Sequence, residues 1–312
     1  MTVDTLRVKV FPGAQNLPFY AGLRQGLFEA RGIALALEFT RNSVELRDDL
    51  AAGRVDVVHT AVDNAVAMHQ SGQPIVVFMG GDSSMNEFFV QAGIDSFAEL
   101  RGRVLIVDAV DTAYALQAEK ILADRGMKAG EDYRVVAVGA TYQREQALAD
   151  NPGFAASILN PPYSLRGRAR GMKSLGRVVD LIGRYQATGA FAMRDWFGRH
   201  QELIERYIAA YLVALQWSRD PANHGICAEL LSQYLDLDAD LARQTLDRVL
   251  EPGFGLTPDA ALDREGFRNV LRWRAELGRG TAGDAAEDET RYVDLSCYER
   301  VMSRGFVRAD AV

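Results

Sequence analysis

The sequence has little cysteine, no excess of basic residues and no long hydrophobic run, and each shortage argues against a class of protein. Its 2 cysteines, Cys227 and Cys297, form no C-x-x-C pair or Cys/His cluster, so we expect neither a zinc site nor thiol redox chemistry. We expect two buried thiols, and a disulfide between them stays open. A net charge of −7 provides no basic field, so no nucleic-acid partner is expected.

Segments that would direct the chain to a membrane are also missing from the pattern. No run of about 18 apolar residues occurs, so nothing in the sequence is expected to span a bilayer. The first residues, MTVDTLRVKV, lead directly into a strand pattern and lack the basic and apolar regions of a signal peptide. Two locations stay open: the cytoplasm if Met1 is the native start, and the periplasm if a leader was removed.

The sequence does have a regular alternation of strand and helix patterns. With 48% hydrophobic and 25% charged residues it is typical of a globular protein, and its length suits two domains of about 100–200 residues each. Before residue 82 the alternation indicates a largely parallel sheet flanked by helices. The predicted elements are strands near 6–10, 34–40, 55–60 and 74–81 and helices over 18–31, 44–52 and 63–70.

The same pattern restarts over about residues 88–187, without repeating the sequence. After Tyr185 the pattern becomes helical, beginning with apolar and aromatic residues at helical spacing over 193–220. The polar, glycine-rich stretch 278–296 is the best candidate for a mobile loop. The sequence thus predicts two α/β units followed by helices.

Several motifs, spread along nearly the whole chain, resemble one family in their order and spacing. They are Pro18-Phe19-Tyr20 followed by GLFEARGI, then DDLAAGRVDVVHTAVDNAV, DSFAELRGRVLIVDAVDTAY, ASILNPPYSLRGRARG, and the late AYLVALQWSRDP and RYVDLSCYE. Together they resemble the type 2 periplasmic solute-binding proteins of ABC transporters, in the NMT1/THI5-like branch of thiamine-pyrimidine, sulfonate, taurine and nitrate binders. Glu99 departs from the Asp that is usual in this branch. The cysteine-rich motif of the thiamine-pyrimidine synthases is absent, so the resemblance does not imply that activity.

The resemblance implies an α/β fold of two lobes with an interlobe cleft and C-terminal helices. It divides the chain into residues 1–87 as the first part of lobe 1, 88–187 as lobe 2, and 188–312 as the return to lobe 1 with the C-terminal helices. It also implies a small-molecule ligand in the cleft, hinge motion of the lobes and an ABC permease as partner. We expect a monomer without cofactor or metal.

Loops beyond the carboxyl ends of the predicted strands supply the candidate ligand contacts, because open α/β sheets bind ligands at that edge. Alternative roles stay open for some of them: helix capping for Thr60, packing on the sheet for Phe19 and Tyr20, and plain solvation for Arg41. The candidates are Asn16, Phe19, Tyr20, Arg41, His59, Thr60, Ser84, Asp111, Thr112, Tyr114, Asn160, Tyr163 and Tyr185.

The charge pattern at one of these loops favours a particular ligand chemistry. Asp108 and Asp111 flank Thr112 at a helix start where the resemblance would place an anion, and two carboxylates repel an oxyanion. We therefore expect a neutral or weakly cationic ligand, with a simple N-cap role for Asp111 as the alternative. Aromatic residues near the same gap are hypothesised to stack on a planar ring: Tyr20, Phe88, Tyr114, Tyr163 and Tyr185.

Two functions stay open at this point. The first is a solute-binding protein that captures a small, planar, heterocyclic molecule for ABC-type uptake. The alternative is a cytoplasmic enzyme on the same fold, of the lyase, decarboxylase or desulfinase type, acting on a small aromatic substrate. His59 is the candidate acid–base group of that enzyme, because a histidine titrates near neutral pH. A cytoplasmic ligand sensor is a weaker third option.

Overall fold

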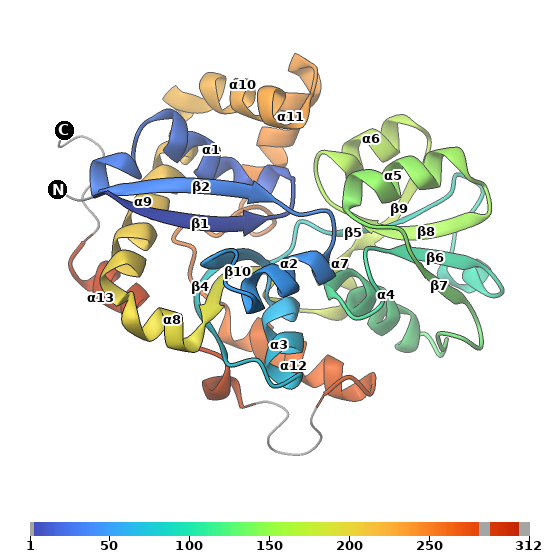
Figure 1. Cartoon of the computed structure of the whole chain (residues 1–312). Coiled ribbons are helices and arrows are strands. Elements are labelled where there is room, and N and C mark those ends of the chain that lie inside the picture. Colours follow the sequence, from blue (N-terminus) through green and yellow to red (C-terminus); the bar gives the residue numbers. More distant parts are fainter. Residues whose placement is uncertain (1–2, 281–287, 306–312) are drawn as a thin grey trace.

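The chain folds into two α/β lobes, which lie side by side in the computed structural model (Figure 1). The structure describes residues 3–280 and 288–305. Each lobe is built on its own five-stranded sheet, with strand order β2-β1-β3-β10-β4 in lobe 1 and β7-β6-β8-β5-β9 in lobe 2. The two-lobed α/β architecture expected from the sequence is therefore confirmed.

Both sheets combine parallel strands with one antiparallel strand, which is the first strand after the chain passes from one lobe to the other. In lobe 1, β10 runs antiparallel between β3 and β4, and in lobe 2, β5 runs antiparallel between β8 and β9. The strands are β1 (Asp4–Val10), β2 (Ile33–Phe39), β3 (Val57–Ala61), β4 (Ile75–Asp82), β5 (Glu87–Val90), β6 (Val104–Val107), β7 (Arg134–Ala137), β8 (Phe154–Leu159), β9 (Lys173–Arg177) and β10 (Thr188–Met193).

Helices cover both faces of each sheet, and the sequence alternation within the strands explains why. Successive side chains of a strand point to opposite faces. In β4, Val76 and Phe78 join one apolar cluster, while Ile75 and Val77 join another. The helices of lobe 1 are α1 (Leu17–Arg24), α2 (Ser43–Ala51), α3 (Val62–Gln70), α8 (Arg194–Arg199), α9 (Gln201–Arg219), α10 (His224–Leu235), α11 (Ala239–Leu250), α12 (Arg264–Glu276) and α13 (Ser296–Ser303).

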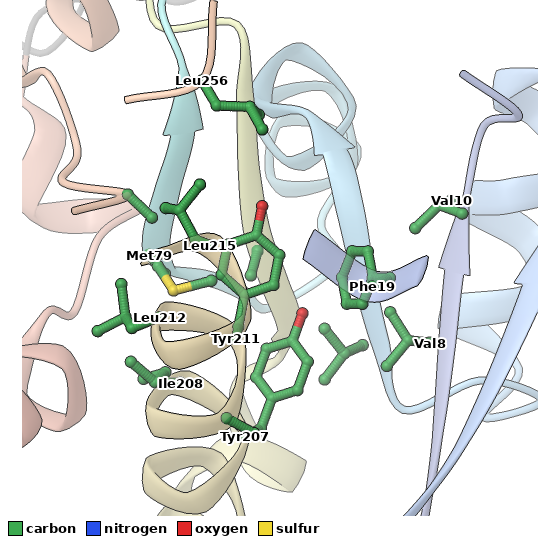
Figure 2. Close-up of a cluster of buried hydrophobic side chains, with 14 of the residues drawn as sticks. Val8, Val10, Phe19, Met79, Tyr207, Ile208, Tyr211, Leu212, Leu215 and Leu256 are labelled. Carbon is green, nitrogen blue, oxygen red and sulfur yellow. The ribbon is translucent and has the colours of Figure 1, made fainter. Parts of the chain in front are cut away.

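The long helix α9 forms the centre of the larger lobe 1 cluster. Tyr207, Tyr211 and Leu215 of this helix pack in one cluster with Phe19 of α1 and the strand residue Val8 (Figure 2). All five are at most 1% exposed. Burying aromatic and aliphatic side chains of this size contributes about 1.5–3 kcal/mol each, so this cluster anchors the C-terminal helices to the N-terminal strands.

Lobe 2 is smaller and carries four helices: α4 (Ala113–Ala123), α5 (Thr141–Asp150), α6 (Tyr163–Ala169) and α7 (Val178–Ile182). The chain enters this lobe between Asp82 and Glu87 and leaves it between Ile182 and Thr188. Leu116 of α4 reaches across and packs in the lobe 1 cluster beneath α3 and α12. The lobes therefore touch through side chains as well as through the two crossovers.

Several predicted elements differ from the observed ones at their ends. The helix expected over 18–31 stops at Arg24, and the one expected over 193–220 divides into α8 and α9 at His200. Strands β9 and β10 and helices α6 and α7 were not predicted, and β10 corrects the expectation that the chain becomes helical directly after Tyr185. The proposed mobile loop 278–296 includes residues 281–287, which lie outside the described residues.

Candidate functional site

A small buried cavity lies where the two lobes meet, at the carboxyl ends of several strands. Its volume of about 40 Å³ leaves room for only a few water molecules. It is lined by Phe11, Gln15, Ser43, Thr60, Ala61, Asn64, Asp82, Met85, Asn86, Asp108, Thr112, Ala113, Tyr114, Gln117, Asn160, Tyr185, Ala187 and Thr188. Both crossovers and both lobes contribute, so a change in the angle between the lobes alters this cavity directly.

On the lobe 1 side, Asp82 ends strand β4 and faces the start of β10. Thr188 pairs with it in the sheet and donates its hydroxyl hydrogen to Asp82 Oδ2, and the Ser84 N–H donates to Oδ1 at 2.9 Å. Burial raises the pKa of Asp82, and these hydrogen bonds offset part of that rise. A side chain on Gly81 would collide with the Thr188 hydroxyl, so glycine at that position permits the close pairing.

On the lobe 2 side, Asp108 follows strand β6 and is held by hydroxyl groups from both lobes. Ser43, at the start of α2 in lobe 1, donates to Asp108 Oδ2 at 2.8 Å, and Thr112 donates to Oδ1. Asp108 is 4% exposed. The Ser43–Asp108 hydrogen bond crosses the cleft and therefore belongs to the closed arrangement of the lobes.

Four amide groups leave an atom unpartnered in the wall of the cavity. These buried atoms are the oxygens of Gln15, Asn64 and Asn160 and the Nε2 of Gln117. Asn86 Nδ2 donates to the oxygen of Gln117 at 2.8 Å, which fixes that amide in the wall. Buried polar atoms are normally hydrogen-bonded, so this concentration in one cavity makes it the candidate binding site.

Two tyrosines provide the large flat surfaces of the site. Tyr114 lies over the guanidinium of Arg144, whose Cζ is 4.1 Å from the ring centroid. Tyr185 stacks on Trp273 with centroids 5.8 Å apart, and its hydroxyl donates to Asp63 Oδ2. Burial raises the pKa of both tyrosines, so both hydroxyls stay protonated at neutral pH.

Of the residues predicted from the sequence, five line this cavity: Thr60, Thr112, Tyr114, Asn160 and Tyr185. Ser84 lies in the first crossover, where its hydroxyl accepts from the Asn86 N–H at 3.2 Å. Asp111 accepts from Arg274 at 2.9 Å instead of capping the helix. Arg41 is exposed beside α2, and Tyr163 is buried at the start of α6, 6.5 Å from the Tyr142 ring.

The remaining predicted residues lie inside lobe 1, and their expected place in the cleft is corrected. Asn16 donates to the Phe11 carbonyl at 2.7 Å, and Tyr20 stacks on Tyr234 with centroids 3.9 Å apart. Phe19 packs edge-on against His59 in the α9 cluster. The apolar face of α1 covers the sheet, so the aromatic side chains of Phe19 and Tyr20 pack in the lobe 1 cluster. Phe88 likewise packs in the core of lobe 2.

The candidate enzyme residue His59 also lies away from the cavity wall. Its Nδ1 is 3.1 Å from the Tyr207 hydroxyl, and the rings of Phe19 and Tyr211 surround it. Burial lowers its pKa to about 3, so the imidazole is neutral at physiological pH. A neutral histidine inside an aromatic cluster stabilises the fold, and His59 is not among the residues that line the cavity.

Some cavity residues were not predicted at all. Asn64 and Gln117 lie on α3 and α4, within helices, and Thr188 begins the return strand β10. For Gln117 a signal existed, because it follows Tyr114 by three residues and therefore shares its helix face. Thr188 had none, because its position depends on the antiparallel return of the chain into lobe 1.

Other site types find no support in the part of the chain that the structure describes. Residues 3–280 and 288–305 contain no group of three or more His, Cys, Asp or Glu side chains arranged to hold a metal ion. Over the same residues, no helix combines the length and the apolar character needed to cross a bilayer. Both cysteines are buried and free.

Comparison with known proteins identifies the family. The NMT1/THI5-like family model matches residues 14–223, which is more than half of the chain. The chain therefore belongs to the NMT1/THI5-like family. A comparison with curated protein sequences finds no match.

Solved structures share the two-lobed fold of type 2 periplasmic binding proteins at low sequence identity. The periplasmic nitrate-binding protein NrtA from Synechocystis PCC 6803 is 13% identical, with a TM-score of 0.82 over 99% of this chain and 90% of that chain. The aliphatic sulphonate binding protein SsuA from Escherichia coli is 15% identical, with a TM-score of 0.72 over 89% and 87%. A ligand-binding component of an ABC-type import system from Staphylococcus aureus, solved with zinc bound, is 14% identical, with a TM-score of 0.76 over 96% and 99%.

Proposed function

We propose that this protein is a solute-binding protein that captures a small organic molecule between its lobes and delivers it to an ABC permease. The observation that carries the proposal is the interlobe cavity with unpartnered amide atoms from both lobes. Asn64 belongs to lobe 1, and Gln117 and Asn160 belong to lobe 2. A ligand that hydrogen-bonds to all three joins the lobes, as expected of a protein that closes on its cargo.

The location and the partner follow from the same assignment. The structurally similar nitrate and sulphonate binders are named as periplasmic proteins, and the Staphylococcus aureus protein as part of an ABC-type import system. We extend these roles to this chain: it acts in the periplasm, as a monomer, with a permease as its partner. The lobes must part for the ligand to enter, because the cavity holds only about 40 Å³ in the closed arrangement.

The shape of the site supports a planar ligand. Tyr114 and Tyr185 line the cavity from lobe 2 and from the second crossover, and Phe11 adds a third ring from lobe 1. Stacking on aromatic faces contributes about 0.5–1.5 kcal/mol per pair beyond the burial of area. We therefore propose a small heterocycle or aromatic compound as cargo.

The test is a thermal-shift screen of the purified chain against heterocycles, sulfonates and aromatic acids. A ligand of the cleft raises the melting temperature of the wild type, and Gln117→Ala loses at least tenfold in affinity because the ligand forfeits a buried hydrogen bond. Gln233→Ala is the matched control, since Gln233 is an exposed amide on α10. Mass spectrometry of the compound after incubation separates transport from catalysis: a binding protein returns it unchanged. The proposal is contradicted if no compound in the screen binds in a way that depends on Gln117. It is also contradicted if mass spectrometry shows that the bound compound has been converted.

A further inference from the structure

We infer that the ligand of this cleft is a small planar cation with N–H donors, of the amidinium, guanidinium or protonated-heterocycle class, and that Asp82 and Asp108 are its counter-ions. The inference rests on the proposed function and specifies the charge of the ligand. It separates this cleft from those of structural relatives named for nitrate and sulphonate, which are anions.

The first observation is a pair of buried carboxylates that form no ion pair. Asp82 of lobe 1 and Asp108 of lobe 2 line the same cavity and are 2% and 4% exposed. Their hydrogen-bond donors are hydroxyl groups and one backbone N–H. Within residues 3–280 and 288–305, neither forms an ion pair with Lys, Arg or His. A buried carboxylate without a paired counter-charge is costly, and this cost raises the pKa of Asp82. A cationic ligand supplies the paired charge and favours the ionised form of the carboxyl.

The cationic side chains nearest the cavity do not line it. None of the residues lining the cavity is Lys, Arg or His. Arg144 approaches from α5 of lobe 2 and interacts electrostatically with Asp108 without forming an ion pair. It lies under the Tyr114 ring, and its guanidinium bonds to the Gly139 and Ile158 carbonyls and to two hydroxyl groups. Arg274 approaches from α12 and is engaged by Asp111, with Asp63 at 3.7 Å.

The second observation is independent of charge and concerns the unpartnered amide atoms. Three of the four are oxygens, on Gln15, Asn64 and Asn160, and one is the Nε2 of Gln117. Asn64 is 1% exposed and Gln117 is fully buried. Together with the two carboxylates, acceptors predominate among these atoms, and acceptors require N–H or O–H donors from the ligand. Nitrate and sulfonate offer acceptors only, and a planar cation with several N–H groups matches both the donors required and the faces of Tyr114 and Tyr185.

The test compares three probes that share a ring and differ in charge: benzamidine, benzamide and benzoate. Binding to the wild-type chain is measured by calorimetry and thermal shift. We expect benzamidine to bind at least tenfold more tightly than benzamide, and benzoate to show no binding. We expect Asp108→Asn to reduce the affinity for benzamidine at least tenfold and that for benzamide less than threefold. The retained benzamide binding reports that the variant is folded.

The outcomes separate this inference from the proposed function. Equal binding of benzamidine and benzamide overturns the inference of a cationic ligand. Binding of benzoate, taurine or nitrate that Gln117→Ala abolishes also overturns it. In both cases the solute-binding role stands. Failure of every cation in a panel of small amidines, guanidines and protonated heterocyclic amines also overturns it. If Asp108→Asn does not fold, the comparison of the three probes on the wild type decides alone.

Discussion

His59 lies on β3 and Asp82 on β4, the two strands that pair with β10 in the lobe 1 sheet, and burial shifts their pKa values in opposite directions. The pKa of His59 falls to about 3, which keeps the imidazole neutral, whereas the pKa of Asp82 rises. Both shifts arise because a low-dielectric interior disfavours the charged form. The difference in role comes from position: His59 is enclosed by aromatic rings, and Asp82 lines the cavity.

The histidine shift predicts how stability depends on pH. The pKa of His59 is lower in the folded chain than in the unfolded chain. Between the two values only the unfolded chain binds the proton, so the free energy of unfolding falls as pH drops below about 6.5. His59→Gln removes this contribution. Between pH 7 and pH 5, we expect the free energy of unfolding to decrease by about 1–2 kcal/mol less in this variant than in the wild type. Urea unfolding measures this difference. His224→Gln, at the first residue of α10, is the control. Equal pH dependence of the wild type and His59→Gln contradicts the prediction.

Two tyrosines that the sequence placed together in one aromatic clamp are predicted to behave differently when truncated. Tyr20 is fully buried against Tyr234, so Tyr20→Ala should lower the free energy of unfolding by about 3–5 kcal/mol through the cavity it leaves. Tyr114→Ala should weaken ligand binding at least tenfold, because the ring is lost from the cavity wall. Denaturant unfolding and calorimetric titration measure the two effects. A Tyr20 variant of wild-type stability with weakened binding would restore Tyr20 to the site.

At the scale of elements, helices α4 and α12 hold the lobes together on one side of the cleft. Arg279, just beyond α12, donates to both carboxylate oxygens of Glu119 at 2.6 and 2.7 Å, and Glu276 is 2.9 Å from Lys120. Arg274 adds its contact with Asp111. Each pair is worth only about 0–1 kcal/mol when partly exposed, but all of them connect lobe 1 to lobe 2. We expect this ionic contact to favour the closed arrangement.

Charge reversal tests that role of α12. Arg279→Glu places two carboxylates opposite each other, so the closed state should be less populated and the ligand should dissociate about fivefold faster. The double variant Arg279→Glu/Glu119→Arg restores the opposite charges and should return the dissociation rate to within twofold of the wild type. Stopped-flow displacement measures these rates. A double variant as fast as the single one would show that the pair does not hold the lobes closed.

The elements were more predictable than the site, for a physical reason. The patterns of β3 and α3 are local, so alternation and helical spacing reveal them without knowledge of the fold. Whether a side chain faces the core or the cleft depends on tertiary packing, which is why Tyr20 was placed in the site and Asn64 was missed. The strand ends were the right region, since Thr60 and Asn160 line the cavity. Asp82 and Thr188 also line the cavity, but they meet only because β10 pairs antiparallel with β4. That pairing is a tertiary feature and leaves no local pattern in the sequence.

At the scale of the whole molecule, the two lobes form one site that neither contains alone. Asp82 and Asn64 come from lobe 1, and Asp108, Gln117 and Asn160 come from lobe 2. The crossovers at residues 83–86 and 183–187 connect the lobes beside that site. A ligand that bonds to both walls therefore stabilises closure, and closure in turn buries the ligand.

The most direct measurement of this account is a calorimetric titration of the wild-type chain with the compound that the thermal-shift screen ranks first. We predict one site per chain, heat that ceases once the site is saturated, and at least a tenfold loss of affinity in Gln117→Ala. Heat that continues at a steady rate after saturation would reveal turnover, and unchanged affinity in Gln117→Ala would place the ligand elsewhere. Either result would contradict the assignment of this protein as a solute-binding protein with its site between the lobes.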